Sequence, residues 1–218
     1  MRLSRFEGTP NIGVYARTND SLALVAYNAP EDFTDALSMA LDVKTVKTTV
    51  ASTYLVGSLV AMNSHGAVVS DQIEGAELEE ISKHIPVLVL SDKLNAAGNN
   101  ILVNDFGALV NPGIGKRSLE EISNFLKVDA VSMSIAGCST VGSMCVATNK
   151  GCLCCPDASD DDLNAIGKIL NVEARRCTVN HGVAQIGAGL VCNSKGALIG
   201  DESTPIEMGK IEDGLNLF

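Results

Sequence analysis

The hydrophobic and polar positions of the chain repeat one pattern five times. In the stretch 98–122, an apolar run begins at Gly98, a polar turn ends at Gly107, and a second apolar run follows. Leu119 and Ile122 then lie three residues apart, as residues on one face of a helix do. The stretch therefore predicts a strand that begins at the leading glycine, a tight turn, a second strand and a helix.

The landmarks of this stretch recur with nearly constant spacing. The leading glycine and the turn position of each unit are eight or nine residues apart: Gly13 and Ser21, Gly57 and Gly66, Gly98 and Gly107, Gly142 and Gly151, Gly187 and Gly196. A large apolar residue follows twelve residues after each turn position: Phe33, Leu78, Leu119, Leu163, Met208. Successive turn positions are separated by 45, 41, 44 and 45 residues. Repeats of this length are typical of arrays, solenoids or closed rings.

The two ends of the chain complement each other. The first four units continue after the helix into a third strand, but only a few residues follow the helix of the fifth. The segment 2–6 precedes Gly13 much as 174–178 precedes Gly187, so we infer that the N-terminal segment supplies the missing strand. Such closure removes the open sheet edge. We therefore expect one α/β domain over 1–218, which forms a fivefold pseudosymmetric ring of strand-strand-helix-strand repeats. The repeats are expected at about 13–56, 57–97, 98–141, 142–186 and 187–218, and residues 1–8 close the last one.

The helices of this ring carry recognisable start signals. Ser118 with Glu121 predicts a capping box, in which hydroxyl and carboxylate satisfy exposed amide donors reciprocally. Ser159 precedes three aspartates, and Thr204 precedes a first-turn proline. The residues three before each turn glycine are interpreted as local turn caps that serve the fold: Asn63, Asn104, Thr148, Asn193.

Composition narrows the function classes. The chain has 46% hydrophobic residues, and no apolar run approaches the ~20 residues that span a bilayer. The N-terminal residues lack the apolar segment of a signal peptide, so we expect a cytoplasmic protein without membrane contact. A net charge of −10 argues against broad, phosphate-driven binding of nucleic acid.

Seven cysteines lie between residues 138 and 192, and we interpret them as small buried core residues. The run 152–155 invites a metal interpretation. On a strand, however, Cys152 and Cys154 face one way and Cys155 the other, and no second pair with zinc-type spacing accompanies them. We expect core packing, with no metal and no cofactor.

A ring of five such units resembles the pentein (α/β-propeller) fold. Three segments, KLNAAGNNILVNDFGALVNP (93–112), SIAGCSTVGSMCVATNKG (134–151) and TVNHGVAQIGAGLVCN (178–193), are similar to the translation initiation factor 6 family in its short archaeal form. The resemblance implies a non-enzymatic monomer that binds the large ribosomal subunit and prevents joining of the small subunit. It also implies contact mainly with a ribosomal protein near the sarcin–ricin loop, limited contact with rRNA, and a role in large-subunit maturation.

The resemblance also suggests contact residues. Asn99 matches a position at the family's ribosomal contact, although asparagine in a loop often bonds its own backbone instead. Other candidates share its position in the repeat, lie near it, or occupy a loop expected on the same face. The ribosome-binding candidates are Ser58, Lys93, Asn95, Asn99, Asn100, Ser143, Asn180 and His181.

Other penteins are enzymes that act on guanidino or amidino groups through a cysteine nucleophile, a histidine and acidic partners. Cys138 and His181 could share a face, so a Cys–His pair is conceivable. Cys138 has no acidic neighbour in its Gly-Cys-Ser-Thr loop, and the chain lacks long insertions that would enclose a substrate. We therefore expect no enzymatic activity, and keep this class as the alternative.

Overall fold

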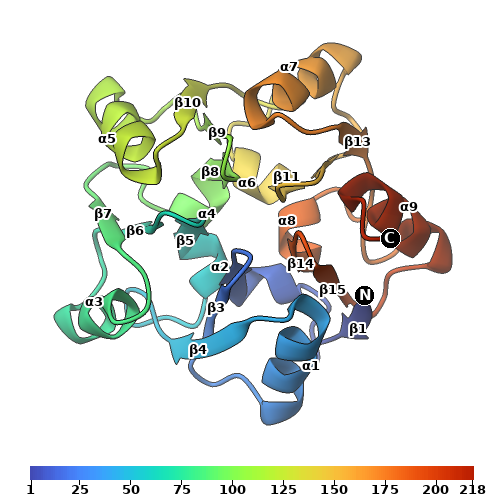
Figure 1. The fold of residues 1–218 in the computed structure, drawn as a ribbon, viewed down its shortest axis with the longest axis horizontal. Coiled ribbons are helices and arrows are strands. Elements are labelled where there is room, and N and C mark those ends of the chain that lie inside the picture. Colours follow the sequence, from blue (N-terminus) through green and yellow to red (C-terminus); the bar gives the residue numbers. More distant parts are fainter.

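A computed structural model describes residues 1–218 and arranges them as five units around a central axis (Figure 1). Each unit contributes one three-stranded sheet, and its helix lies at the rim. Within every sheet the first two strands are antiparallel, and the third runs parallel to the second. The predicted fold class, a fivefold pseudosymmetric α/β ring, is confirmed.

The five units contain equivalent elements. The first strands, which surround the axis, are β2 (Ala16–Thr18), β5 (Val60–Met62), β8 (Ile101–Val103), β11 (Cys145–Ala147) and β14 (Leu190–Asn193). The second strands are β3 (Leu22–Ala26), β6 (Ala67–Ser70), β9 (Gly107–Val110), β12 (Cys152–Cys154) and β15 (Gly196–Gly200). The third strands are β4 (Lys44–Thr48), β7 (Val87–Leu90), β10 (Asp129–Ser132), β13 (Ala174–Arg176) and β1 (Arg2–Ser4).

Two sets of helices complete the units. The rim helices are α1 (Glu31–Leu41), α3 (Gly75–Ser82), α5 (Lys116–Leu126), α7 (Asp160–Leu170) and α9 (Pro205–Leu215). Single helical turns close to the axis precede the first strands: η1 (Ile12–Val14), α2 (Val56–Leu59), α4 (Ala97–Asn100), α6 (Val141–Met144) and α8 (Ile186–Gly189). None of the helices combines the length and apolar character needed to cross a membrane.

The N-terminal strand closes the ring. β1 pairs with β15 in parallel register, with Arg2 opposite Leu198 and Ser4 opposite Gly200. The two chain ends consequently lie near each other in the fifth unit (Figure 1). This confirms the prediction that the N-terminal segment supplies the third strand of the fifth unit.

The hydrophobic core is divided among five clusters that neighbouring units share. In one of them, Leu22 and Val46 of the first unit pack with Val56 and Ile81 of the second. A rim helix therefore buries its apolar face between its own sheet and the preceding one. Since no unit encloses a core of its own, each unit depends on its neighbours for stability.

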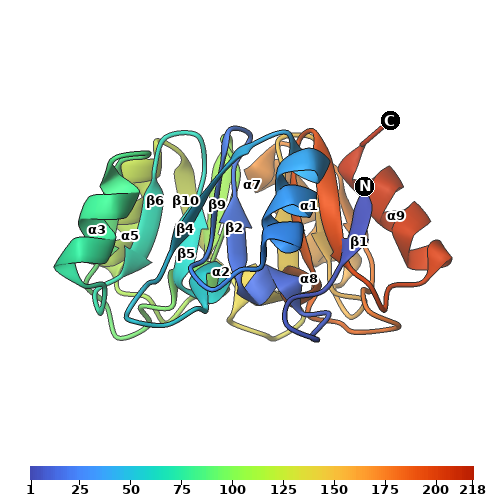
Figure 2. The same ribbon diagram turned by 90° about the horizontal axis from the view of Figure 1, so that it is seen from below.

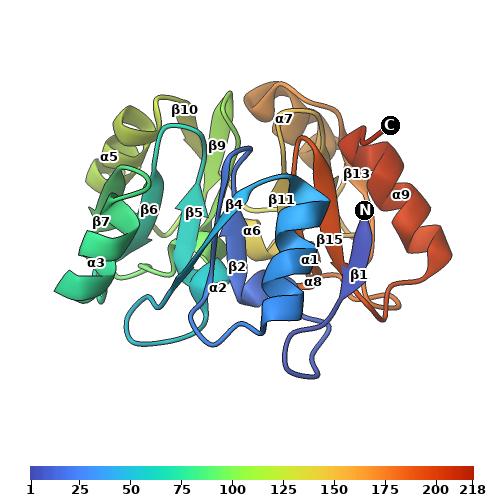
Figure 3. The same cartoon turned by 60° about the horizontal axis from the view of Figure 1, so that its bottom comes forward.

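The ring has two distinct faces (Figures 2 and 3). We call one the loop face; it carries the axial helical turns and the loops that lead to them, at 5–14, 49–59, 91–100, 133–144 and 177–189. We call the other the turn face; it carries the hairpin turns at 19–21, 63–66, 104–106, 148–151 and 193–195. The rim helices begin near the loop face and end near the turn face. The expected gathering of the connecting loops on one face is thus confirmed.

Two local predictions were wrong. The leading glycines do not begin strands but lie inside the axial helical turns, and in every unit the strand starts three residues later. The Ser118–Glu121 capping box does not form, because α5 begins earlier, with Gly115 as its N-cap. Ser118 instead donates its hydroxyl to Asp92 Oδ2 at 2.9 Å, so a carboxylate from the preceding loop serves this helix end. The predicted helix starts at Ser159 and Thr204 are confirmed, and both residues form capping boxes, with Asp162 and Glu207 respectively.

The turn asparagines connect the units as well as capping their own turns. Asn104 accepts backbone hydrogen bonds from Phe106 and Gly107, which is the local role that the sequence predicts. Its amide also donates to the backbone oxygens of Thr148 at 3.0 Å and Leu170 at 2.8 Å in the next unit. Asn63 and Asn193 make the same pair of bonds to their neighbours, which the sequence pattern did not reveal.

Candidate docking face

Five glycines meet around the axis of the loop face. A Cβ atom built on Gly57 would overlap the backbone oxygen of Gly13, and one on Gly98 would overlap that of Gly57. The same relation links Gly142 to Gly98, Gly187 to Gly142, and Gly13 to Gly187, so the contacts form a closed ring. The approach leaves room only for hydrogen, which explains why every unit has glycine at this position.

The residue after each ring glycine borders a shallow axial depression of about 20 Å³. These residues are Val14, Ser58, Asn99, Ser143 and Ala188. The structure thereby brings together three of the sequence-predicted residues, Ser58, Asn99 and Ser143, from three different units. A depression of this volume holds about one water molecule, so this centre of the loop face is nearly closed.

Two of these side chains have unused hydrogen-bonding capacity. Asn99 and Ser58 are partly exposed, and neither side chain makes a hydrogen bond within the chain. Ser143 differs, because its hydroxyl donates to the backbone oxygen of Thr140 at 2.7 Å and contacts Thr140 Oγ1 at 2.9 Å. Asn99 and Ser58 are therefore the axial polar groups most ready to bond a partner.

A shallow polar groove of about 450 Å³ is lined by six residues, which include Lys93 and Asn95. Lys93 is exposed and makes no ion pair or side-chain hydrogen bond. Asn95 donates its amide to Asp71 Oδ1 at 2.5 Å, and this bond is the main cause that lowers the pKa of Asp71. The groove thus offers one free cation, Lys93, and two carboxylates, Asp71 and Asp92, that already accept hydrogen bonds within the chain.

Asn100 and Asn180 are buried, with 4% and 5% of their surfaces exposed. The Asn100 amide donates to backbone oxygens of its own loop, and its Oδ1 accepts from Asn111 at 2.7 Å. The Asn180 amide donates to the backbone oxygen of Pro10 at 3.0 Å, and its Oδ1 accepts from Ser203. Both side chains hold the loops in place and present no free polar group to the surface.

His181 lies exposed at the tip of a tight turn, with a positive φ of 62°. Its backbone N–H donates to Glu207 at 3.1 Å, and that of Gly182 donates to the same carboxylate at 2.8 Å. Burial alone would raise the pKa of Glu207, but hydrogen bonds from Thr204, Thr178 and Gly182 outweigh it and lower that pKa to about 2. The helix cap of the fifth unit therefore fixes the loop that presents His181.

A sequence model of the eIF-6 family matches residues 1–214. The chain belongs to the eIF-6 family. It is 41% identical over 209 residues to translation initiation factor 6 of Methanocorpusculum labreanum, and 42% identical over 206 residues to that of Methanoculleus marisnigri, with 94% of each chain covered in both cases. It is 38% identical to translation initiation factor 6 of Archaeoglobus fulgidus, covering 95% of this chain and 96% of the relative.

All seven cysteines of this eIF-6 family member are free thiols. Cys138 is the one cysteine that is not buried, and its sulfur contacts Thr140 Oγ1 at 3.2 Å. No histidine lies within hydrogen-bonding distance of it. Burial raises the pKa of Cys177 to about 11 and that of Cys192 to about 12, which disfavours the reactive thiolate.

The cysteine run behaves as a strand, as the sequence predicts. Cys152 and Cys154 lie on the same side of β12, with their sulfurs 3.8 Å apart, and Cys145 packs with them in the core. No group of three or more His, Cys, Asp or Glu side chains is gathered in a way that could hold a metal ion.

Charge is unevenly distributed around the loop face of this eIF-6 family member. Most rim helices begin there with acidic residues: Glu31, Asp32, Glu77, Asp160, Asp161, Asp162, Glu207. α5 is the exception, since it begins with Lys116 and Arg117. Asp92 Oδ2 accepts from Gly115 N–H at 3.0 Å, so the loop that carries Lys93 lies against this helix start. We call Lys93, Lys116 and Arg117 the basic sector; within it the Nε of Arg117 is ion-paired with Glu121 Oε1 at 2.9 Å.

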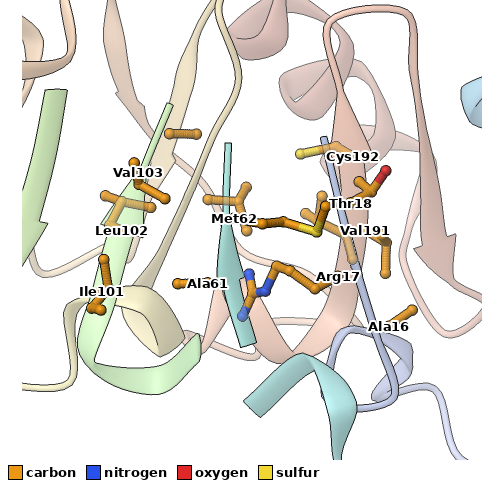
Figure 4. A pocket seen from close by; sticks show the side chains of 13 residues that line it. Ala16, Arg17, Thr18, Ala61, Met62, Ile101, Leu102, Val103, Val191 and Cys192 are labelled. Carbon is orange, nitrogen blue, oxygen red and sulfur yellow. The ribbon is translucent and has the colours of Figure 1, made fainter. Parts of the chain in front are cut away.

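The sequence interpretation missed Arg17 as a residue of this region. Arg17 lies on β2 and points into the axial channel (Figure 4). The equivalent positions of the other units are apolar: Ala61, Leu102, Val146 and Val191. The sequence did contain a signal for Arg17, because the other four repeats have an apolar residue at this position.

Proposed function

We propose that this protein binds the large ribosomal subunit through its loop face and thereby prevents the small subunit from joining. The observation that carries the proposal is the pair of free polar side chains, Asn99 and Ser58, at the centre of a nearly flat and closed face. Membership of a family whose relatives are named translation initiation factor 6 supports a partner in the translation machinery. Steric exclusion needs only a rigid body in the right place.

The charge distribution favours a ribosomal protein as the main partner. Acidic helix starts around most of the rim would repel phosphates and attract a basic protein surface. The basic sector of Lys93, Lys116 and Arg117 is where limited contact with rRNA, such as the sarcin–ricin loop, is best accommodated. We expect a monomer to dock in this way, and the same occupancy would fit a role in large-subunit maturation.

The contact set follows from accessibility. We assign direct contacts to Asn99, Ser58, Ser143, Lys93, Asn95 and His181, all of which are exposed or partly exposed on the loop face. Asn100 and Asn180 support their loops from below the surface. No observation favours the alternative of an enzyme acting on guanidino groups.

Sedimentation tests the proposal. Purified archaeal large subunits are mixed with the protein, challenged with small subunits, and separated on a gradient. We expect the protein to travel with free large subunits and joined ribosomes to decrease as it is added. Protein that stays at the top of the gradient while joining proceeds would overturn the proposal.

A further inference from the structure

The Arg17 side chain occupies the axial channel directly beneath the ring of glycines. Its Nε–H donates to the backbone oxygen of Val60 at 3.0 Å. Its Nη2 donates to the backbone oxygen of Gly57 and, at 3.1 Å, to that of Gly98. The guanidinium lies beside Ala61, whose small side chain leaves space for it (Figure 4).

This guanidinium has no carboxylate partner. The ion pairs of the chain involve Arg5, Arg117, Arg175 and Arg176 among the arginines, but not Arg17. Burial lowers the pKa of Arg17 to about 10, so the group still carries its charge at neutral pH. The side chain is only partly buried, and hydrogen bonds to backbone oxygens replace the hydration that its charge loses.

The bonded oxygens belong to the residues that precede the candidate contacts. Gly57 precedes Ser58, and Gly98 precedes Asn99. A single nitrogen of Arg17 bonds both of these glycine oxygens, which belong to neighbouring units. The planar, multiply donating guanidinium therefore joins α2 to α4 in a way that a lysine ammonium cannot reproduce in full.

We propose that Arg17 is the positioning residue of the docking face: its guanidinium bridges the central turns of the second and third units and so fixes the spacing of Ser58 and Asn99. The inference rests on the proposed function for its effect on docking. The Arg17 side chain also lines the axial depression of the loop face. It acts through the two backbone oxygens that set where the contact side chains stand.

Three variants test this role. Arg17→Ala empties the bridge, Arg17→Met fills the channel without donors, and Arg17→Lys restores the charge alone. Leu102→Ala is the matched control, because Leu102 occupies the equivalent position in the third unit and makes a cavity without removing a donor. All variants are compared at a temperature where thermal unfolding shows each to be fully folded.

The readouts are affinity for large subunits and the NMR signals of the Asn99 side-chain amide. We expect Arg17→Ala and Arg17→Met to bind large subunits at least about tenfold more weakly than the native protein, and to show shifted Asn99 signals. The affinity of Arg17→Lys should lie between theirs and that of the native protein. Leu102→Ala should bind with native affinity. Methylguanidinium at millimolar concentration should restore the Asn99 signals of Arg17→Ala, since it can bind the backbone oxygens that the Arg17 guanidinium has vacated. A merely stabilising role predicts equal losses for Leu102→Ala and unshifted Asn99 signals at full folding.

Unchanged Asn99 signals in folded Arg17→Ala or Arg17→Met would overturn the proposal, as would native affinity in both. The two hypotheses fail separately. If the native protein does not bind large subunits, the proposed function falls, while the Asn99 signals and their recovery with methylguanidinium still decide whether Arg17 positions the face.

Discussion

The backbone oxygen of Gly13 lies so close to Gly57 that a methyl group on Gly57 would overlap it. Five contacts of this kind close around the axis, each between glycines of adjacent units. The closest packing of the ring is therefore backbone against backbone. Backbone cannot rotate away as a side chain can, so this centre has no room for an added side chain.

Replacing a ring glycine should destabilise the protein strongly. Gly142→Ala would press a methyl group against the backbone oxygens of Gly98 and Ile101. We expect a loss of about 1–3 kcal/mol or more in the free energy of unfolding, measured by urea denaturation.

Gly209→Ala is the matched control, because Gly209 lies exposed within α9 and a Cβ there meets nothing within 4 Å. It should stabilise the protein by about 0.5–1 kcal/mol, since alanine favours helices over glycine. Equal effects of the two substitutions would contradict the ring packing.

The turn asparagines should contribute stability across unit boundaries. Asn104→Ala leaves the buried backbone oxygens of Thr148 and Leu170 without a donor, which we expect to cost about 1–3 kcal/mol of unfolding free energy. Asn104→Asp should cost more, because a carboxylate oxygen would face those two oxygens. Asn164→Ala, at an exposed and unbonded position of α7, should change stability little. Urea denaturation gives the free energy of unfolding of the three variants. If Asn104→Asp were as stable as the native protein, the role of Asn104 would be purely local.

Acid should release the loop that Glu207 holds. The pKa of Glu207 is lowered in the folded state from its ordinary 4.5 to about 2, so the carboxylate stabilises the fold above pH 4.5. This contribution is lost as the pH falls from 4.5 towards 2, and the shift corresponds to about 3 kcal/mol. Glu207→Gln should therefore be less stable than the native protein at pH 7, and the difference should shrink by pH 2.5. A difference that is the same at both pH values would rule out this carboxylate as the source.

The basic sector should govern the salt dependence of docking. Replacing Lys93, Lys116 and Arg117 by alanine should weaken binding to large subunits and reduce the slope of log affinity against log salt by up to about one per contacted phosphate. The control is Lys168→Ala, an exposed lysine in the last turn of α7, near the turn face. The affinity for large subunits is measured by titration at several salt concentrations. If the triple variant kept the native slope, any RNA contact would lie elsewhere on the protein.

The sequence predicted the units, the closure and the face on which the loops gather, because these follow from periodicities of apolar residues and glycine. Phe33, twelve residues after its turn position, lies in α1 as the apolar spacing indicates. The helical turn around each leading glycine could not be read in this way. Its conformation is fixed by the approach of a neighbouring unit, as at Gly57 and Gly13, which no local pattern records.

The site was predictable only where position in the repeat determines exposure. Ser58, Asn99 and Ser143 share one repeat position and meet at the axis, as the alignment of units suggests. Asn100 and Asn180 lie beside accessible residues in the sequence, yet they are buried, because a helical turn and a tight turn direct adjacent side chains oppositely. Likewise, Asp92 accepts hydrogen bonds from Gly115 and Ser118, which lie more than twenty residues away along the chain, and sequence spacing does not reveal these bonds.

The most direct test of docking through the loop face compares one substitution on each face. Asn99→Lys places a long charged side chain at the centre of the loop face, and Phe106→Lys places one at an exposed position of the turn face. Each variant is added to large subunits before small subunits, and joined ribosomes are measured by sedimentation, with thermal unfolding as a check on folding. Docking through the loop face predicts that Asn99→Lys loses most of its inhibition of joining, whereas Phe106→Lys inhibits like the native protein. Full inhibition by Asn99→Lys together with loss of inhibition by Phe106→Lys would contradict it.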